Sequence, residues 1–459
     1  MKIRLKKLDI YTHTSVKPIS FLFESKITFI YGNIGVGKTT LLSLVMYCLG
    51  SDLVETPAVI DQFVSAGLYI EINSDNFVFR REYKSARIFV SDSQNKVYKI
   101  DKREISDFIY SKAGILSVYY EQNGTPTPHK ITFNNYLWYS YLKQTDIDNN
   151  FFYLSKDANE FYQIASTNAL ASLLGKNNFV NKEQKNILSD KRKRLKKYEN
   201  GKTALDYVVS QEFINYVNAE YDHVKDEYNR LRKTRVENDD TINLKIKSVD
   251  EKLRILGRVL INYNKFCQEY SELKKQVVEF SSNIPRTKED EFEKNLHDLG
   301  DIFKNCLVAI GFPSVSKSDN VIYNMKNLNP TIVNEYTKTR YSFDLLGSGG
   351  KKTLFKICFL IAVHIKVQEL TSNKNRLPSL IIIDTPMKNI SEREDKELFD
   401  NFYKYLLELS TTTLSNTQLI IIDKERNGII NNDNSNVISI SKEHPLFPEF
   451  LDARLWRER

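Results

Sequence analysis

Four residues near the N-terminus have the types and the spacing that hold phosphate groups. Gly32, Gly37, Lys38 and Thr39 fit the pattern of a glycine, four residues of any type, then glycine, lysine and serine or threonine. The glycines let backbone N–H groups turn inward, while the amine and the hydroxyl supply a positive charge and an oxygen ligand. We expect Lys38 to bridge the β- and γ-phosphates of a nucleotide and Thr39 to join the shell of a Mg²⁺ ion.

The segments on either side of this pattern supply the structural context that it needs. Apolar residues 25–31 predict a strand before the loop, and residues 40–49 predict a helix after it. The helix N-terminus adds a partial positive charge to the same place. This context argues against the alternative that the glycines mark an ordinary turn.

Two later segments supply further groups for phosphate or metal. Asp384 ends the apolar run LIIID, so its carboxylate is expected at the carboxyl end of a strand, within reach of the Mg²⁺ shell. The alternative for Asp384 is a cap for the helix predicted over residues 391–409. Ser348, Gly349 and Gly350 precede a long apolar helix over residues 351–370, which predicts a second anion-binding surface at its N-terminus.

The remaining pattern predicts an α/β protein interrupted by a helical segment. An antiparallel β lobe is expected over residues 68–100, followed by a strand and a helix ending near Gln144 within residues 130–149 and another helix over residues 157–174. Near the C-terminus, continuous apolar strands indicate a parallel sheet that is buried on both faces. The expected strands outside the β lobe cover residues 2–10, 19–23, 321–323, 378–384, 418–422 and 437–440.

Between residues 181 and 300 the composition shifts to lysine, glutamate, asparagine and tyrosine, with apolar residues at heptad spacing. One apolar series runs Leu205, Val209, Phe213, Tyr216, Val224, Tyr228 and Leu231. A second runs Ile242, Ile246, Val249, Leu253, Leu256, Leu260 and Tyr263, and resumes from Phe266 to Phe280. Two helices joined by a polar turn at residues 237–240 therefore predict an antiparallel hairpin with arms of roughly 50–60 Å. The alternative is an ordinary helical subdomain packed on the rest of the protein.

Composition limits the class of protein. The chain has 459 residues, 41% of them hydrophobic, which is enough for two or three folded domains. Its four cysteines lie far apart, and it has neither an apolar leader nor an apolar run of membrane-spanning length. We therefore expect a cytoplasmic protein without a membrane partner. The net charge of +8 permits a polyanionic partner but does not require one.

In combination these motifs resemble the ABC-type ATPases of the SMC, RecF and RecN kind. The matching segments are GNIGVGKTT (Walker A), Gln144 in YLKQTDID (Q-loop), SGGKK from Ser348 (signature) and LIIID ending in Asp384 (Walker B). The resemblance implies an α/β fold, an ABC-type P-loop ATPase head with a mixed β lobe and a parallel-sheet lobe, split by a helical hairpin or coiled-coil insertion. The expected domains are residues 1–180 and 301–459 for the two parts of the head and 181–300 for the insertion.

The resemblance also assigns roles to residues. It implies that ATP and Mg²⁺ are the cofactors, with Thr39, Gln144 and Asp384 at the metal and Lys38, Gln144 and Asp384 in catalysis. It further implies a homodimer or higher homo-oligomer in which each signature segment completes the partner's ATP site. The arms carry no C-x-x-C, so no zinc hook is expected. The residues expected to contact the nucleotide are Gly32, Asn33, Gly35, Gly37, Lys38, Thr39, Thr40, Ser348, Gly349 and Gly350.

Two departures from the family pattern predict slow hydrolysis. Thr385 stands where the family has the glutamate that activates water, and Lys424 lies where a switch histidine is expected. A threonine cannot take a proton from water near neutral pH, and a lysine is normally charged there. Asp423 or Glu425 is a candidate substitute base. We therefore expect an ATPase with weak or regulated turnover.

Function beyond ATP rests on the basic run KRKRLKK at residues 191–197, which is of the kind that follows a phosphate backbone. A solvated helix face explains the run equally well. The leading interpretation is an ATP-gated, DNA-associated dimer similar to the ATPase subunits of anti-phage systems such as Septu or Lamassu, with an effector nuclease encoded nearby. The alternatives are a RecF/RecN-like repair ATPase and a non-hydrolysing scaffold locked by ATP.

Overall fold

The computed structural model describes the chain apart from residues 121–128, 156, 177–179, 209–210, 234–239, 283–288, 371–374, 389–395, 426–427, 431–434 and 448–459. The protein forms two compact units. One, here called the head, consists of Met1–Phe179 and Thr287–Arg459; the other, here called the arm, is Val180–Arg286. The arm therefore ends before residue 300, because α9 (Glu289–Ala309) packs against α10 (Gly349–Glu369) within the head.

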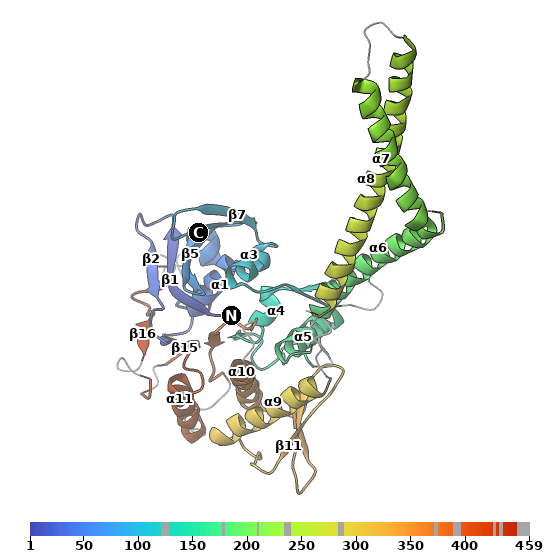
Figure 1. Cartoon of the computed structure of the whole chain (residues 1–459). Coiled ribbons are helices and arrows are strands. Elements are labelled where there is room, and N and C mark those ends of the chain that lie inside the picture. The colour runs from blue at the N-terminus through green and yellow to red at the C-terminus, as the bar shows by residue number, and fades with distance from the viewer. Residues whose placement is uncertain are drawn as a thin grey trace. The chain divides into compact units, whose positions relative to one another are not determined.

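An antiparallel sheet forms one layer of the head (Figure 1). Its strand order is β2-β1-β4-β5-β6-β7. Alternating burial along β5 follows from the period of two in a pleated strand, which turns every second side chain into the core. The strands are β1 (Ile3–Thr12), β2 (Ile19–Leu22), β4 (Phe63–Ile72), β5 (Asp75–Glu82), β6 (Arg87–Asp92) and β7 (Val97–Asp101).

A parallel sheet forms the second layer, in the order β10-β14-β15-β3-β16. All residues of β14 and β15 are buried, as expected for parallel strands covered on both faces. This order places the carboxyl ends of β14 and β15 beside the end of β3. The strands are β3 (Ile27–Tyr31), β10 (Tyr141–Leu142), β14 (Leu380–Asp384), β15 (Gln418–Asp423) and β16 (Asn436–Ser439).

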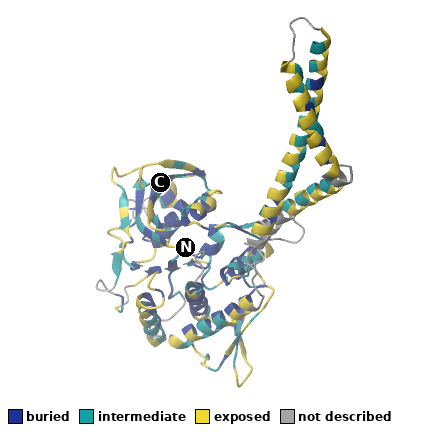
Figure 2. Ribbon diagram, viewed as in Figure 1, coloured by how far each residue is buried: buried dark blue, intermediate teal, exposed yellow. Residues whose placement is uncertain are grey.

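Helices and two small sheets complete the head. Helix α10 is buried over most of its length, and Figure 2 shows buried residues concentrated in it and in the sheets. The other helices are α1 (Lys38–Cys48), α2 (Pro57–Gln62), α3 (Ile105–Ala113), α4 (Phe133–Leu137), α5 (Glu160–Leu173) and α11 (Lys396–Thr411), with a 3₁₀ turn η1 (Phe343–Leu345). The small sheets pair β8 (Val118–Tyr120) with β9 (His129–Ile131) and β12 (Pro330–Val333) with both β11 (Asn320–Tyr323) and β13 (Arg340–Ser342).

The predicted fold class is confirmed: an α/β head with antiparallel and parallel sheets is interrupted by a helical hairpin. One prediction within the head is wrong. The helix expected to reach Gln144 is only α4, which ends at Leu137, and residues 141–142 form strand β10. Its aromatic composition suits either structure, and pairing with β14 at the edge of the parallel sheet decides for the strand.

The arm consists of α6 (Val180–Val208), α7 (Gln211–Lys233) and α8 (Asp240–Ser282). Both α6 and α7 pack against α8, and Figure 1 shows α7 and α8 side by side. Every member of the second apolar series from Ile242 to Val277 is buried or half-buried, so the heptad prediction for α8 is confirmed. Residues 237–239 of the predicted turn lie outside the described residues.

The first predicted apolar series is one residue out of register at Phe213 and Tyr216, while the side chains of Leu205 and Val209, which begin this series, lie outside the described part of the chain. Phe213 and Tyr216 are exposed, whereas Ile214 and Val217 are buried. Counting back from the buried Val224 in alternating steps of three and four residues leads to Val217 and Ile214. Heptad spacing therefore decides which side chains are buried here, even though the exposed Phe213 and Tyr216 are larger.

Among the described residues, no helix is both long and apolar enough to cross a membrane.

Candidate nucleotide-binding site

The loop after β3 takes its shape from close contacts with the C-terminal part of the head. Gly32 and Gly37 have φ values of 157° and 99°. A Cβ atom on Gly32 would lie 1.9 Å from the carbonyl oxygen of Ile440, and one on Gly37 would lie 2.5 Å from Cβ of Leu446. The backbone N–H of Leu446 also donates to the carbonyl of Val36 at 3.0 Å. Glycine is therefore required at both positions.

Lys38 begins α1 directly after this loop and turns back over it. Its Nζ donates to the carbonyl oxygens of Gly32 at 2.5 Å and Asn33 at 2.8 Å. Burial lowers the pKa of Lys38, the charges of Asp384 and Asp423 act against this shift, and that of Lys424 adds to it. The ammonium group thus lies within the loop, where an anionic phosphate can take the place of the two carbonyl acceptors.

Asp384 is the last residue of β14 and is fully buried. Its Oδ1 accepts a hydrogen bond from the Thr385 hydroxyl at 3.0 Å, while Oδ2 is buried without a hydrogen-bond partner among the described residues. Burial raises the pKa of this carboxyl, and the hydroxyls of Thr385 and Thr39 and the charge of Lys38 oppose the rise. A divalent cation would supply the partner that Oδ2 lacks.

The residues therefore fit a Mg²⁺ ion that is shared with a ligand. Asp384 offers a carboxylate oxygen and Thr39 a hydroxyl oxygen, and Mg²⁺ is a hard cation that prefers oxygen ligands. Over the described ranges, no group of three or more histidine, cysteine, aspartate or glutamate side chains forms a metal cluster. The remaining positions in the shell would belong to phosphate oxygens and water, as is usual for Mg²⁺ bound with a nucleotide.

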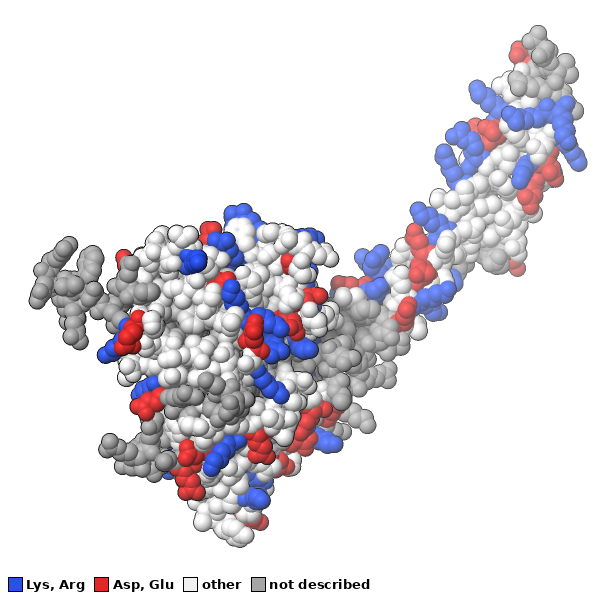
Figure 3. All heavy atoms as spheres, turned by 90° about the vertical axis from the view of Figure 1, so that its left-hand side faces the viewer, with Lys and Arg blue, Asp and Glu red and all other residues white. Residues whose placement is uncertain are grey.

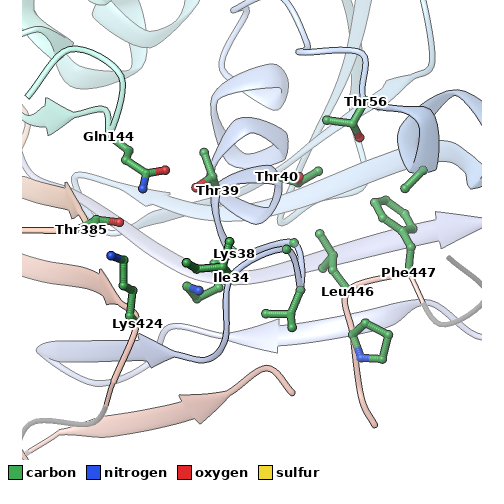
Figure 4. Close-up of a pocket in the computed structure, with 15 residues that line it drawn as sticks. Ile34, Lys38, Thr39, Thr40, Thr56, Gln144, Thr385, Lys424, Leu446 and Phe447 are labelled. Carbon is green, nitrogen blue, oxygen red and sulfur yellow. The ribbon is translucent and has the colours of Figure 1, made fainter. Parts of the chain in front are cut away.

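A pocket of about 310 Å³ opens above the loop. Figure 4 shows Gln144, Thr385, Lys424, Lys38 and Thr39 gathered toward one end and Thr56, Leu446 and Phe447 toward the other. The pocket thus has a polar, cationic end and a more apolar end. Its lining is Ile34, Gly35, Val36, Gly37, Lys38, Thr39, Thr40, Thr56, Ala58, Gln144, Thr385, Lys424, Pro445, Leu446 and Phe447.

Gln144 reaches the polar end from the segment after β10. An ion pair holds this segment, because Nζ of Lys388 donates to the carbonyl oxygen of Gln144 at 2.9 Å and to Oδ1 of Asp148 at 2.9 Å. Pairing of β10 with β14 brings Gln144 and Thr385 to the same sheet edge. The structure therefore collects Gln144 with the phosphate-loop residues, although 105 positions separate it from Thr39 in the sequence.

Thr385 has an unusual backbone conformation. Its φ is +59°, which is a true outlier for a β-branched residue, and its N–H donates to the carbonyl oxygen of Ile422 at 2.7 Å. Lys424 lines the pocket nearby. Among the described lining residues none is acidic, so the polar end carries the positive charges of Lys38 and Lys424 without a carboxylate at its surface.

The two candidate substitute bases lie outside the pocket lining. Asp423 is buried, and its carboxylate accepts hydrogen bonds from the Tyr403 hydroxyl at 2.9 Å and from the Lys424 N–H at 2.7 Å. Glu425 is exposed and does not line the pocket. In this geometry neither carboxylate lines the polar, cationic end of the pocket.

The predicted signature residues are also apart from the pocket. Ser348 caps α10, and its hydroxyl accepts a hydrogen bond from the Lys351 N–H at 3.4 Å. Gly349 and Gly350 form the first turn of that helix. Ser348 is exposed, and none of the three residues lines the pocket of its own chain. Ser348 at the N-terminal end of α10 is therefore accessible at the surface.

The sequence did not predict the residues that line the more apolar end of the pocket. Thr56 caps α2, and Pro445, Leu446 and Phe447 come from the C-terminal segment, which runs beside the phosphate loop. No motif marks these residues. The one available signal is the need for glycine at residue 37, which indicates a close neighbour without identifying it.

Comparison with known proteins places the chain in a family. The family model described as AAA domain matches residues 2–254, more than half of the chain. A search of curated proteins found no match.

Several solved structures are similar at low identity. The Smc head domain of Pyrococcus furiosus with an extended coiled coil, bound to the C-terminal domain of ScpA, is 13% identical over 92% of this chain and 90% of that one, with a TM-score of 0.45. The Smc head domain of Pyrococcus yayanosii with a coiled coil and joint is 14% identical over 92% of each chain, with a TM-score of 0.47. An SmcHead bound to the C-winged helix domain of ScpA is 13% identical over 96% and 94%, with a TM-score of 0.47.

Proposed function

Because the chain belongs to the family described as AAA domain, we propose that it binds ATP together with Mg²⁺ and hydrolyses ATP slowly. The observation that carries this proposal is the pairing of a buried, partnerless oxygen on Asp384 with the Lys38 loop. The phosphates would lie over the loop, and Mg²⁺ would be held by Thr39 and Asp384, with Gln144 nearby. The nucleoside would extend toward Leu446 and Phe447, because an apolar wall suits a base better than a phosphate.

Slow turnover follows from the side chains at the cationic end of the pocket. Lys38 and Lys424 would stabilise the charge of a bound triphosphate, but Thr385 cannot accept a proton from water. The expected resting state is therefore an ATP-bound protein. Asp423 and Glu425 would contribute to catalysis only if the polypeptide between residues 423 and 425 moved toward the phosphates.

ATP would also join two copies of the chain. The exposed Ser348 at the start of α10 offers a hydroxyl and backbone N–H groups to an anion, yet it does not line the pocket of its own chain. A second copy placed head-to-tail would bring this helix end to the γ-phosphate. We therefore include a homodimer or higher homo-oligomer with composite ATP sites in the proposal.

The arm supplies the support for a DNA partner. Arg192, Lys193, Arg194, Lys196 and Lys197 are all exposed on α6. Figure 3 shows further lysine and arginine side chains along the arm, interspersed with acidic ones. An exposed run of this kind binds phosphates without reading base sequence. Nζ of Lys193 lies 3.8 Å from Oδ1 of Asp190, but both side chains are largely exposed, so this ion pair would compete only weakly with a phosphate for Lys193.

An effector nuclease and a role in anti-phage defence are proposed only from the resemblance to Septu and Lamassu. A nuclease or toxin gene beside this one would favour defence over DNA repair. A scaffold that ATP locks without turnover is the other alternative, and a nucleotide-dependent oligomeric state together with brisk turnover would exclude it.

Calorimetry tests the nucleotide site. The change Lys38→Ala removes the ammonium group inside the loop, so ATP binding should weaken at least tenfold, equivalent to about 1.4 kcal/mol. Lys17→Ala is the matched control, because Lys17 is an exposed lysine of the same unit that does not line the pocket. Equal ATP affinity for wild type and Lys38→Ala would refute the site.

A further inference from the structure

The head contains a second cavity, of about 310 Å³, on the other side of the segment that carries Gln144. Along this segment the lining alternates, because Lys143 and Asp146 line the second cavity whereas Gln144 lines the nucleotide pocket. Helix α1, which starts in the phosphate loop, reaches the same cavity near its end through Met46. Two structural elements thus connect the two cavities directly.

Aromatic side chains form an apolar part of this cavity. The ring centroids of Trp138 and Tyr153 are 4.8 Å apart, and Tyr162 lies 5.2 Å from Tyr153 and 6.0 Å from Trp138. Tyr162 is 45% exposed, so the aromatic cluster remains open to solvent. Aromatic surfaces of this kind bind planar rings, including nucleic-acid bases, by stacking.

The backbone beside these rings is strained. Phe152 and Tyr153 are consecutive non-glycine residues with φ values of 52° and 59°. Such conformations persist only where the surroundings enforce them, and they concentrate at functional sites. Here the N–H of Tyr153 donates to Oδ1 of Asn150 at 2.6 Å, and the Ser166 hydroxyl donates to the carbonyl oxygen of Phe152. Lys356 from α10 holds the residues just before them, since its Nζ donates to the carbonyl oxygen of Asp146 at 2.7 Å and to that of Asn150. The cavity therefore has a floor held by a buried lysine.

Several polar groups at the cavity have no partner. Oδ1 of Asn134 is buried without a hydrogen bond, and the Tyr141 hydroxyl makes none within the described part of the chain. Burial raises the pKa of Tyr141, so its hydroxyl is a neutral donor. The exposed Lys143 forms no ion pair with any described residue. An amide and a hydroxyl match the polar edge of a heterocycle, and an unpaired ammonium group matches a single phosphate.

We propose that this cavity binds a free nucleoside monophosphate. The ring would lie against Trp138 and Tyr153, its edge would bond Asn134 and Tyr141, and its phosphate would pair with Lys143. A volume of about 310 Å³ is at the lower end of the range for small-ligand sites, roughly 300–1,000 Å³. This proposal is separate from ATP binding at the Lys38 loop.

Occupancy would also influence the ATP site, and this part rests on the proposed ATP function. A ligand held by Lys143 fixes the segment from which Gln144 projects into the nucleotide pocket. By linkage, ATP and the second ligand would then change each other's affinity by the same factor.

Tryptophan fluorescence provides a direct measurement of binding, because Trp138 lies in the cavity and the sequence has two tryptophans. The change Trp456→Phe leaves Trp138 as the single reporter. The full-length chain is titrated with AMP, GMP, CMP and UMP, with and without the additional change Lys38→Ala. We expect a saturable signal with a Kd below about 1 mM for at least one of them, unaffected by Lys38→Ala.

Two variants and a control test the contacts. Tyr141→Phe removes one hydroxyl and should weaken binding by about threefold to tenfold. Lys143→Ala should weaken binding of the monophosphate but not of the matching nucleoside, whereas Lys317→Ala, an exposed lysine that does not line the cavity, should change neither.

Four results would overturn the proposal. The first is the absence of a saturable fluorescence signal with any of the four monophosphates, and the second is loss of that signal in Lys38→Ala. The third is full affinity for the monophosphate in both Tyr141→Phe and Lys143→Ala. The fourth is a signal that only single-stranded DNA produces. If the wild-type protein bound no ATP by calorimetry but kept the fluorescence signal, the proposed ATP function would be refuted instead, so the two failures can be told apart.

Discussion

Replacing Thr385 with glutamate tests why this ATPase should be slow. Thr385 follows Asp384 directly, lines the nucleotide pocket and is 3% exposed. A glutamate there would add a carboxylate at the phosphate end of a pocket whose described lining has no acidic side chain. The φ of +59° disfavours any non-glycine residue, but it disfavours threonine more than glutamate because threonine is β-branched. We therefore expect the variant to fold.

General-base assistance sets the size of the effect. A well-placed base contributes about 10²- to 10⁴-fold to the rate, which corresponds to lowering the activation free energy by roughly 2.7–5.4 kcal/mol. Steady-state phosphate release should therefore rise from well below about 1 per second in the wild type toward the range of efficient phosphoryl-transfer enzymes. The rate gain should be nearer 10²-fold if the new carboxylate pairs with Lys424, which lines the same end of the pocket as Lys38.

Thr385→Gln is the matched control, since glutamine has the shape of glutamate without its basicity. It should leave phosphate release at the wild-type rate. The competing account is that Asp423 or Glu425 already serves as the base. Under that account Thr385→Glu changes little, and Asp423→Asn or Glu425→Gln abolishes hydrolysis. Equal acceleration by glutamate and glutamine, or a rapid wild type that survives loss of both Asp423 and Glu425, would refute the reasoning.

Two further predictions concern the arm and α10. Replacing four exposed basic residues of α6 with glutamate should weaken DNA binding for all DNA sequences alike and reduce the salt dependence of binding, as measured by fluorescence anisotropy. Arginine-to-lysine changes at two of the four positions keep the charge and should have neither effect. Unchanged DNA affinity in the glutamate variant would show that this run is only a solvated helix face. The four are Arg192, Arg194, Lys196 and Lys197. Burial lowers the pKa of Lys356 to about 7 from its ordinary 10.5, so between pH 7 and 8.5 the unfolded chain holds a proton that the folded chain lacks. The free energy of unfolding should then rise with pH by up to about 1.4 kcal/mol per pH unit more in the wild type than in Lys356→Met, as measured by urea denaturation, and equal slopes would contradict the assignment.

Local and periodic patterns made part of this structure predictable. The phosphate loop was predictable because its pattern lies in residues that are close together in the sequence. The burial of β14 follows from a run of four apolar residues that ends in an aspartate, and the buried face of α8 follows from heptad spacing. Each of these signals lies within a short window of sequence. Local sequence alone therefore predicts that Lys38 follows the phosphate loop and that Asp384 ends a buried strand.

Contacts between distant segments were not predictable. Leu446 lies against Gly37 and Phe447 helps to close the pocket, but nothing in residues 440–447 indicates which loop they meet. Residues 141–142 become a strand only because β14 provides an edge. Asp423 suits a catalytic role by its position in the sequence, yet Tyr403 on α11 binds its carboxylate. In each case tertiary packing decides what local sequence leaves open.

The proposed function requires ATP to join two heads through a pocket on one chain and Ser348 on the other. Light scattering of the purified chain measures this directly, because one copy has a mass of 53.5 kDa. With Mg²⁺ and ATP the mass should rise to about twice that value or more, while with ADP, or in Lys38→Ala, it should stay at one copy. In Ser348→Arg, ATP should still bind but the mass should not rise, since a cation opposes the positive end of α10. A mass that is indifferent to ATP in the wild type, or that rises equally in Ser348→Arg, would contradict the account.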